Sequence, residues 1–312
     1  MSLGFTIFIP AYNRAHLLPR AFASIEAQTL RDFEVVIVDD GSTDATADVV
    51  AAWQARVSFP VRYLHQANQG KHVAHNAAVA AARGEFFVTL DSDDQLLPDA
   101  LERLRRHWLD IPPEARAGYA GVEGLIAFGG RVPVRDRYPQ DVLDTDHLTL
   151  RYRLGVTGDK KNALRTAVLR DHPYPVFPGE RHLRPSIILK RIAHAYRTRH
   201  VNEVIQDCEY QPDGLSSDRN RLRMNNPQGM RRFYAEDLTL HRAWLDRRSR
   251  VRISLDYIRA ALQAGAGFVA QGRELGWQPL WLALYPFGAL RALHTRLRER
   301  VRPIKGAMPR PR

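Results

Sequence analysis

The first hundred residues alternate between short apolar runs and helical patterns, and this alternation limits the fold more than any other feature. Four runs rich in β-branched and aromatic residues predict buried strands, at 5–9, 33–38, 61–64 and 85–90. Between them, apolar residues recur at helical spacing, around 17–25, 49–53 and 70–82. Strands and helices that alternate in this way form βαβ units, so the sequence predicts an α/β fold with a parallel sheet.

The pattern is less regular after residue 100. Helical spacing is present at 97–109, 159–170 and 183–196, and a glycine-rich stretch at 118–134 resembles a pair of strands. From about residue 216 onward the chain is rich in arginine and mostly helical in pattern. The single cysteine, Cys208, lies in a strand-like segment and excludes both a disulfide framework and zinc sites built on several cysteines. We expect it to be a buried thiol in a protein of the reducing cytoplasm.

Polar residues directly follow three of the predicted strands. They are Pro10–Asn13, Asp39–Ser42 and Asp91–Asp94. Because ligands of parallel α/β sheets bind at the carboxyl ends of the strands, we expect the three clusters to converge on one functional edge.

Asp91 and Asp93 would be held together at the end of a strand, where carboxylates repel each other unless a cation lies between them. Carboxylate oxygens suit Mg²⁺ or Mn²⁺, and such an ion can also hold a diphosphate. The alternative is that Asp93 and Asp94 only cap the next helix.

The segment 39–44 and Lys71 also allow two interpretations each. A carboxylate in 39–44 can accept a hydrogen bond from a nucleobase N–H, or the segment is a turn in which Gly41 bends the chain and Ser42 caps a helix. Lys71 begins a helix, where it can bind a phosphate or can simply be solvated.

Taken together, four motifs stand in a characteristic order: FIPAYNR at 8–14, VVIVDDGSTD at 35–44, Asn68-Gln-Gly70 with His75-Asn76, and ARGE at 82–85 leading to LDSDD at 90–94. This order and spacing closely resemble family 2 glycosyltransferases with the GT-A fold. The resemblance is strong over about 5–105 and weaker through Phe177–Glu180, Asn202–Val204 and 209–216. It implies a Rossmann-like, mostly parallel central sheet flanked by helices.

The resemblance also implies roles for individual residues. Asp39 would hydrogen-bond the base, typically uracil, Lys71 would lie near the base or the phosphates, and Asp91 would approach the ribose or the sugar. Asp93 would bind the metal, Mg²⁺ or Mn²⁺. The loop after the first strand would line the nucleotide, through Pro10, Ala11, Tyr12 and Asn13. The donor implied is a nucleotide-diphosphate sugar, with UDP as the expected nucleotide.

Inversion at the anomeric carbon requires a base for the acceptor proton. Relatives place an acidic residue shortly before a helix in the second half, and Glu180 matches that place, with Asp159 as the reserve candidate. The alternative for Glu180 is an ion pair with Arg181 or Arg184. Many relatives carry a further Glu after a Pro, where this chain has Pro185-Ser186.

The resemblance predicts a nucleotide-sugar-binding half at 1–100 and an acceptor-binding half at 101–220. The arginine-rich helical pattern that follows predicts a helical, basic C-terminal extension at 221–312. The chain holds 46 Lys and Arg against 34 Asp and Glu, and residues 291–312 contain eight basic residues and one acid. An apolar segment, 277–293, precedes this tail, so we expect the tail to lie on an anionic membrane surface. The alternative is that Trp281, Leu284 and Phe287 pack on the catalytic domain.

The N-terminus lacks secretory features, and no apolar run is long enough to span a membrane.

We therefore predict a cytoplasmic, peripheral inner-membrane enzyme that inverts configuration and adds one sugar to a lipid-linked surface glycan. The Gln-x-x-Arg-Trp signature and multiple spans of the processive synthases are missing from the sequence. No nucleic-acid partner is expected. A nucleotidyltransferase acting on sugar phosphates is one alternative, although Pro10–Asn13 lacks the glycine-rich loop of that class. A catalytically degenerate sugar-nucleotide-binding protein, suggested by Ser186, is the other.

Overall fold

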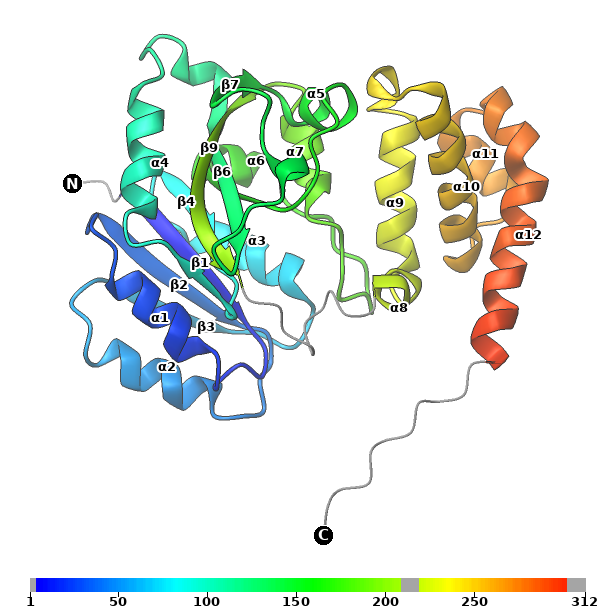
Figure 1. Ribbon diagram of the computed structural model, residues 1–312. Coiled ribbons are helices and arrows are strands. Elements are labelled where there is room, and N and C mark those ends of the chain that lie inside the picture. Colours follow the sequence, from blue (N-terminus) through cyan, green and yellow to red (C-terminus); the bar gives the residue numbers. More distant parts are fainter. Residues whose placement is uncertain (1–3, 209–218, 302–312) are drawn as a thin grey trace. The chain divides into compact units, whose positions relative to one another are not determined.

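The computed structural model describes residues 4–208 and 219–301, and its internal contacts divide the chain into two compact units (Figure 1). The first unit is Met1–Leu222 and the second is Arg223–Arg312. The first contains the sheet, and the second is helical.

One half of the sheet in the first unit is parallel, in the order β3–β2–β1–β4. Its strands are β1 (Phe5–Ala11), β2 (Phe33–Asp39), β3 (Val61–His65) and β4 (Phe86–Thr89). Every residue of β2 is buried, as expected for a continuous β-branched run that is covered on both faces. Ala11 pairs with Asp39, and Asp39 pairs with His65, so three strands end side by side. The predicted α/β fold is confirmed.

Helices cover both faces of this parallel half (Figure 1). The connecting helices are α1 (Leu18–Glu26), α2 (Thr46–Gln54) and α3 (Lys71–Ala81). Phe22 of α1 stacks on Trp53 of α2 with ring centroids 3.8 Å apart, and both rings pack in one core cluster with Phe5. On the opposite face, Phe8 contacts His75 of α3. The sheet edge where the strands end is therefore the part that the helices leave for ligands.

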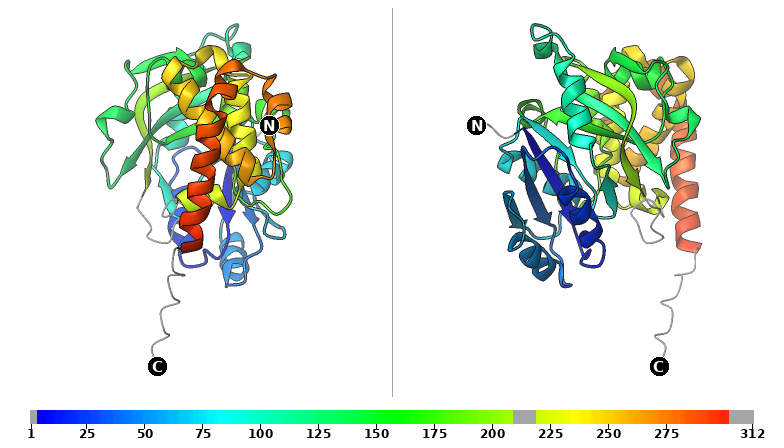
Figure 2. Two further views of the ribbon diagram at one scale, coloured as in Figure 1. Left: turned by 90° about the vertical axis from the view of Figure 1, so that its right-hand side faces the viewer. Right: turned by 60° about the vertical axis from the view of Figure 1, so that its left-hand side comes forward.

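The other half of the sheet is mixed and continues in the order β8–β6–β9–β5, with β7 paired to β9. Figure 2 shows the green strands of this half from two further sides. Its strands are β5 (Asp94–Leu96), β6 (Tyr119–Phe128), β7 (Val142–Thr145), β8 (Lys160–Arg165) and β9 (Arg197–Cys208). β8 runs antiparallel to β4 and so begins at the edge where β4 ends. Short helices connect these strands: α5 (His147–Tyr152), α6 (Thr166–Asp171) and α7 (Ser186–Ile192), with 3₁₀ turns at Arg116–Gly118 and Val134–Asp136.

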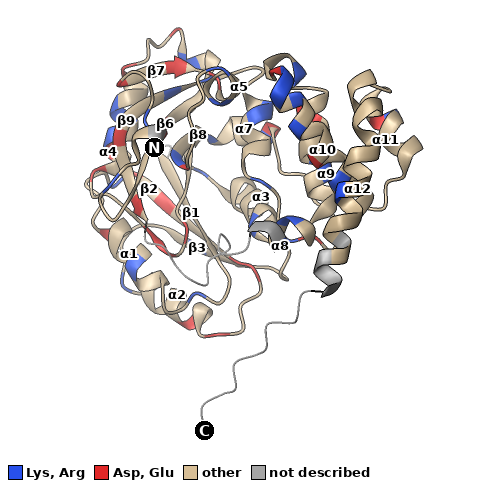
Figure 3. Cartoon of the chain, turned by 45° about the vertical axis from the view of Figure 1, so that its right-hand side comes forward, with Lys and Arg blue, Asp and Glu red and all other residues tan. Residues whose placement is uncertain are grey.

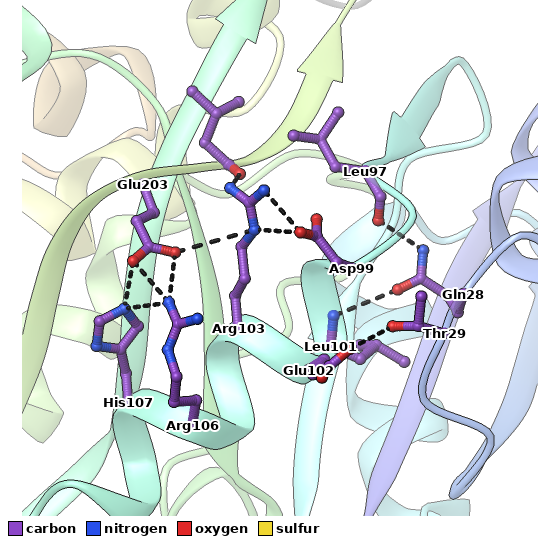
Figure 4. Close-up of polar contacts among 11 residues, drawn as sticks. Gln28, Thr29, Leu97, Asp99, Leu101, Glu102, Arg103, Arg106, His107 and Glu203 are labelled. Atoms are coloured by element: carbon purple, nitrogen blue, oxygen red, sulfur yellow. Dashed lines mark hydrogen bonds and ion pairs between the residues drawn. The ribbon is translucent and has the colours of Figure 1, made fainter.

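Helix α4 (Ala100–Leu109) joins the two halves through polar contacts (Figure 4). Glu203 of β9 accepts hydrogen bonds from Arg106 at 2.8 Å and lies 2.9 Å from His107 Nε2. At the start of the helix, the Gln28 side chain donates to the Leu97 carbonyl at 2.8 Å. These contacts fix the chain directly after the acidic segment 91–94.

Several expected elements differ from the structure. Residues 159–165, predicted as part of a helix, form β8, and only Thr166–Asp171 is helical. The predicted strand pair at 118–134 is one long strand, β6. The helix predicted from residue 97 begins at Ala100, because Asp94–Leu96 pair with β9, and α7 is shorter than the predicted helix at 183–196. Cys208 ends β9 and is buried, as predicted, and Gln206 Nε2 lies 3.0 Å from its Sγ.

The second unit is a helical bundle. It consists of α9 (Pro227–Leu238), α10 (Arg247–Gln263), α11 (Phe268–Leu275) and α12 (Pro279–Val301), with a 3₁₀ turn at Arg242–Trp244; α8 (Arg219–Met224) lies at the boundary. Trp281 is fully buried and stacks on Phe268 with centroids 5.2 Å apart. Gly288 lets α12 approach α10, because a Cβ there would lie 2.7 Å from Ile258 Cβ.

The apolar segment and basic tail predicted at 277–312 belong to the second unit. Trp281 packs in the core of its own unit, Leu284 is partly buried, and Phe287 is 65% exposed. Residues 302–312 of the basic tail, like the motif at 209–216, lie outside the described residues. Across 4–208 and 219–301, no helix combines the length and hydropathy of a membrane span.

Candidate active site

The loops after β1 and β2 are joined by hydrogen bonds at the sheet edge. The Asn13 N–H donates to Ser42 Oγ at 2.9 Å, and the Thr43 N–H donates to Asn13 Oδ1 at 2.8 Å. Asn13 has a φ of 53°, a left-handed conformation that Asn adopts more readily than most residues. The structure therefore brings Pro10–Asn13 and Asp39–Ser42 together. Ser42 binds the β1 loop instead of capping α2, whose N-cap, Ala45, has no side-chain hydrogen bond.

Asp39 is buried at the end of β2, and both of its carboxylate oxygens accept hydrogen bonds. Oδ1 accepts from the Ser42 N–H at 2.7 Å, and Oδ2 accepts from the Tyr63 hydroxyl at 2.5 Å. Burial and the Asp39 charge raise the pKa of Tyr63, which therefore remains a donor. Because each carboxylate oxygen has two lone pairs, Asp39 can accept one further N–H from a ligand. Tyr12, in contrast, is 46% exposed beside this loop.

Asp40 has a structural role. Its Oδ1 accepts from the Gln69 N–H at 2.8 Å and from Gln66 Nε2 at 2.7 Å, and its Oδ2 accepts from the Gly70 N–H at 2.7 Å. These bonds fix the turn that leads into α3. Of the two adjacent carboxylates, Asp39 is therefore the candidate for binding a nucleobase.

Lys71 and Asp91 form an ion pair that joins the start of α3 to the segment after β4. Lys71 Nζ lies 2.5 Å from Asp91 Oδ1, and the two side chains are 39% and 36% exposed. Burial opposes ionisation of Asp91, but the charges of Lys71 and Lys161 outweigh it and lower the pKa of that carboxyl. Asp91 is therefore ionised and accessible to a ligand at this edge.

Lys161 was not recognised from the sequence. It lies on β8, is buried, and its Nζ donates to the Thr89 carbonyl at the end of β4. Burial lowers its pKa, whereas the charges of Asp91 and Asp94 act in the opposite direction. The only sequence signal is a Lys within a short strand-forming run, which no motif marks.

Asp93 and Asp94 differ in burial and in their contacts, so we expect them to have different roles. Asp94 is buried on β5, and its Oδ2 accepts from Gln206 Nε2 at 2.5 Å. Burial, together with the charge of Asp91, raises the pKa of Asp94 to about 6. Asp93 remains partly exposed. Neither residue caps α4, whose N-cap is Asp99, so the capping interpretation is wrong.

The carboxylates at this edge could hold a hard cation such as Mg²⁺ only if a bound ligand supplied further oxygen atoms. Within the part of the chain that the structure describes, no three His, Cys, Asp or Glu side chains are grouped to hold a metal ion. Mg²⁺ and similar ions commonly bind to one or two carboxylates plus substrate phosphates. A partly exposed Asp93 beside an ionised Asp91 fits that mode of binding.

The loop that carries Glu180 packs against the start of α3. A Cβ built on Gly70 would lie 2.7 Å from Arg181 Cα, and the Asn76 side chain exchanges two hydrogen bonds of 2.9 Å with the Tyr174 backbone. Glu180, which is buried, therefore belongs to a segment that touches the residue preceding Lys71. Asp159 is exposed and directly precedes β8, which begins at the same edge. The structure thus places the Glu180 loop against the start of α3, and Asp159 at the end of the sheet where β4 ends.

Comparison with known proteins supports the resemblance. Residues 6–118 match the family model "Glycosyl transferase family 2". An uncharacterized glycosyltransferase of Nostoc sp. is 46% identical over 99 residues, which are 32% of this chain and 31% of the relative. A Campylobacter jejuni GalNAc(5)-diNAcBac-PP-undecaprenol beta-1,3-glucosyltransferase is 36% identical over 121 residues, or 38% of this chain and 37% of the relative. The chain therefore spans about a third of the length of these relatives.

Two solved structures share the fold. Staphylococcus aureus TarS 1-349, in complex with UDP-GlcNAc, has a TM-score of 0.60 and 20% identity over 91% of this chain and 79% of that one. The mannosyltransferase PcManGT of Pyrobaculum calidifontis, in complex with GDP-Man and Mn²⁺, has a TM-score of 0.55 and 20% identity over 95% and 87% of the chains. These structures confirm the GT-A fold, and residues 6–118 of the chain are similar to glycosyltransferase family 2.

Proposed function

We propose that the chain transfers a sugar from a nucleotide-diphosphate sugar to an acceptor hydroxyl. One observation carries this proposal: Asp39, the Lys71–Asp91 ion pair, Asp93 and the Glu180 loop come from separate elements and meet at one sheet edge. Such an edge is where parallel α/β sheets bind their ligands. The family match and the folds of two nucleotide-sugar complexes support the same class of substrate.

The donor we propose is a UDP-sugar. Asp39, held by Ser42 and Tyr63, would accept the N–H of the uracil, and Pro10–Asn13 would line the nucleotide. Lys71 would bind near the phosphates, and Asp91 would hold the ribose or the sugar. The UDP-GlcNAc complex of TarS supports this choice of nucleotide.

A divalent cation, Mg²⁺ or Mn²⁺, would be held by Asp93 together with the diphosphate. When bound, it would neutralise charge on the departing diphosphate. The Mn²⁺ complex of the Pyrobaculum mannosyltransferase supports a metal in this fold.

The reaction we propose is a single inverting displacement. The acceptor oxygen forms a bond to the anomeric carbon while the bond from that carbon to the diphosphate oxygen breaks, and the nucleoside diphosphate leaves with the electron pair. Glu180 takes the acceptor proton as general base, and Asp159 is the alternative base. Residues 101–220, which include both candidates, would form the acceptor-binding half, and 1–100 the donor-binding half.

The acceptor we propose is a lipid-linked surface glycan. The name of the Campylobacter relative includes an undecaprenol-linked diphosphate acceptor, which supports this class. An acceptor of this kind would place the enzyme in the cytoplasm, at the inner face of the membrane, with residues 221–312 as the associating part.

Thermal-shift measurements with a panel of nucleotide sugars, with and without Mn²⁺, test the donor and the metal together. We expect a UDP-sugar to raise the melting temperature more in the presence of Mn²⁺. Asp93→Ala should lose this Mn²⁺ increment and sugar transfer while its own melting temperature stays near that of the wild type. Retained transfer in Asp93→Ala would remove the metal assignment. Slow hydrolysis of the UDP-sugar by the wild type without acceptor distinguishes an enzyme from a degenerate binding protein.

A further inference from the structure

All of the net charge of the chain lies in the second unit. Residues 223–312 contain 18 Lys and Arg against six Asp and Glu, whereas residues 1–222 contain 28 of each. The catalytic half is therefore neutral, and the helical unit carries the full +12. Such segregation indicates that the helical unit meets an extended anionic partner or surface.

Four of the arginines of this unit line one groove between α10 and α12. The groove has a volume of about 430 Å³, and its lining consists of Arg247, Arg248, Val251, Arg252, Leu255 and Arg291. Figure 3 shows Lys and Arg in blue on α10 and on α12. Four arginines thus surround a partly apolar floor.

Few acidic side chains compensate for these arginines. Among the described residues, Arg247, Arg248 and Arg252 make no ion pair, and Arg291 shares Asp256 with Arg259 at 3.3 and 3.6 Å. The first turn of α10 contains no acidic residue, although its N-terminus already carries a positive partial charge. The N-cap Asp246 accepts the Ser249 N–H at 2.7 Å. The repulsion in this groove favours an anion that is not part of the described chain.

An apolar stripe on α12 lies next to the groove. Phe287, which is 65% exposed, is one helical turn before Arg291, and the stripe continues along the helix at helical spacing. Its members are large apolar residues between 39% and 66% exposed: Leu282, Phe287, Leu290, Leu293 and Leu297. The opposite side of α12, with Trp281 and Ala292, is buried in the bundle.

We propose that this face of the second unit is a docking surface for a membrane rich in anionic phospholipids. The arginines of the groove bind lipid phosphates, and the α12 stripe enters the boundary between headgroups and acyl chains. The chemistry favours lipid over nucleic acid, because nucleic acid would leave a row of exposed leucines without a partner. The proposal refines the membrane association proposed above, and it depends on no feature of the active site.

Sedimentation of the full chain with lipid vesicles tests the proposal without any need for turnover. We expect binding to phosphatidylcholine vesicles that contain about 30 mol% phosphatidylglycerol, weakened by salt of about 0.5 M, and little binding to phosphatidylcholine alone. The variant Arg248→Gln/Arg252→Gln should bind about 30-fold more weakly, since each arginine near such a surface contributes about fivefold. The stripe variant Leu290→Gln/Leu293→Gln should also lose binding.

Matched variants distinguish a defined surface from general charge and hydrophobicity. Arg242→Gln/Arg273→Gln removes the same charge from exposed positions outside the groove, and Leu240→Gln removes an exposed leucine outside the stripe. Both controls should bind within about threefold of the wild type.

Equal loss in groove and control variants, or failure of the wild type to bind anionic vesicles, would overturn the proposal. A stable dimer that the stripe variant dissociates, without vesicle binding, would assign the stripe to a second copy instead. UDP-sugar binding by every variant, measured separately, tests the proposed function independently.

Discussion

Gly70 lies directly against the backbone of Arg181, so closely that a Cβ on Gly70 would be 2.7 Å from Arg181 Cα and would overlap its carbonyl group. Gly70 also has a φ of 93°, which only glycine adopts readily. This contact joins the turn before Lys71 to the loop that carries Glu180. Close packing at Gly70 therefore joins the donor-side and acceptor-side segments of the proposed site, together with the hydrogen bonds of Asp40 and Asn76.

Gly70→Ala should destabilise the protein and reduce transfer together. Backbone strain and the clash with Arg181 should lower the free energy of unfolding by about 3 kcal/mol or more. Urea denaturation and kcat/KM for the donor are the measurements. Gly129→Ala is the matched control, because Gly129 has a φ of 56° but no atom near its Cβ position, so strain alone should cost about 1–2 kcal/mol. Equal effects of the two substitutions would show that the Arg181 contact is unimportant.

Glu180→Gln should lower kcat by a factor of about 10²–10⁴ and leave binding of the donor unchanged. The reason is that the amide keeps the shape of the side chain but cannot take the acceptor proton. Asp159→Asn, measured in the same assay, should retain turnover within a few-fold of the wild type. The reverse pattern would identify Asp159 as the base, and the effect of either variant on the melting temperature controls for misfolding.

Lys161→Met should reduce stability by about 2 kcal/mol, because it removes a buried cation and leaves Asp91 and Asp94 less compensated. The loss is smaller than for an isolated buried pair, since Lys71 still contacts Asp91. The adjacent Lys160→Met is the control, because the Lys160 side chain points instead to the Thr157 carbonyl and the Tyr138 ring. If chemical denaturation shows the same stability for Lys161→Met and the wild type, the charge of Lys161 does not support the acidic segment.

His147 should make the protein less stable in acid. Burial lowers the pKa of His147 to about 3, whereas the unfolded chain takes up the proton near its ordinary pKa of about 6.5. The unfolded state therefore binds more protons between these values, and stability falls as the pH decreases through this range. From about pH 7 to about pH 5 the contribution of His147 to this loss should approach about 2 kcal/mol.

Urea denaturation across this pH range measures the effect of His147. His147→Gln should reduce the dependence on pH but not abolish it, because burial also lowers the pKa of His75 to about 3. His16→Gln, at an exposed position, should leave the dependence unchanged. An unchanged slope in His147→Gln would mean that other groups cause the acid sensitivity.

The parallel half of the sheet could be predicted because its strands are continuous apolar runs covered on both faces, as in β2. Strand β8 could not be predicted, because Lys160, Lys161 and Asn162 interrupt any apolar pattern. It is a strand because β4 and β6 provide backbone partners on both sides, which is a tertiary effect.

The same distinction applies to the site. Asp39, Asp91 and Asp93 belong to motifs that a sequence displays, and the structure places them at the predicted edge. Tyr63 and Lys161 belong to no motif, and they reach Asp39 and the end of β4 only because β3 and β8 pair beside those strands. Side chains whose role depends on strand pairing carry no local signal in the sequence.

Cys208 is the one cysteine of the chain, and burial together with the charge of Asp94 raises the pKa of its thiol. Its thiolate form is therefore scarce at neutral pH, and maleimide reagents should modify it slowly in the folded protein. An added cysteine at an exposed position, such as Leu290→Cys, would consequently accept a fluorophore selectively without any removal of the native thiol. The wild-type background is thus already suited to single-site labelling and to fluorescence reporting of the environment around α12.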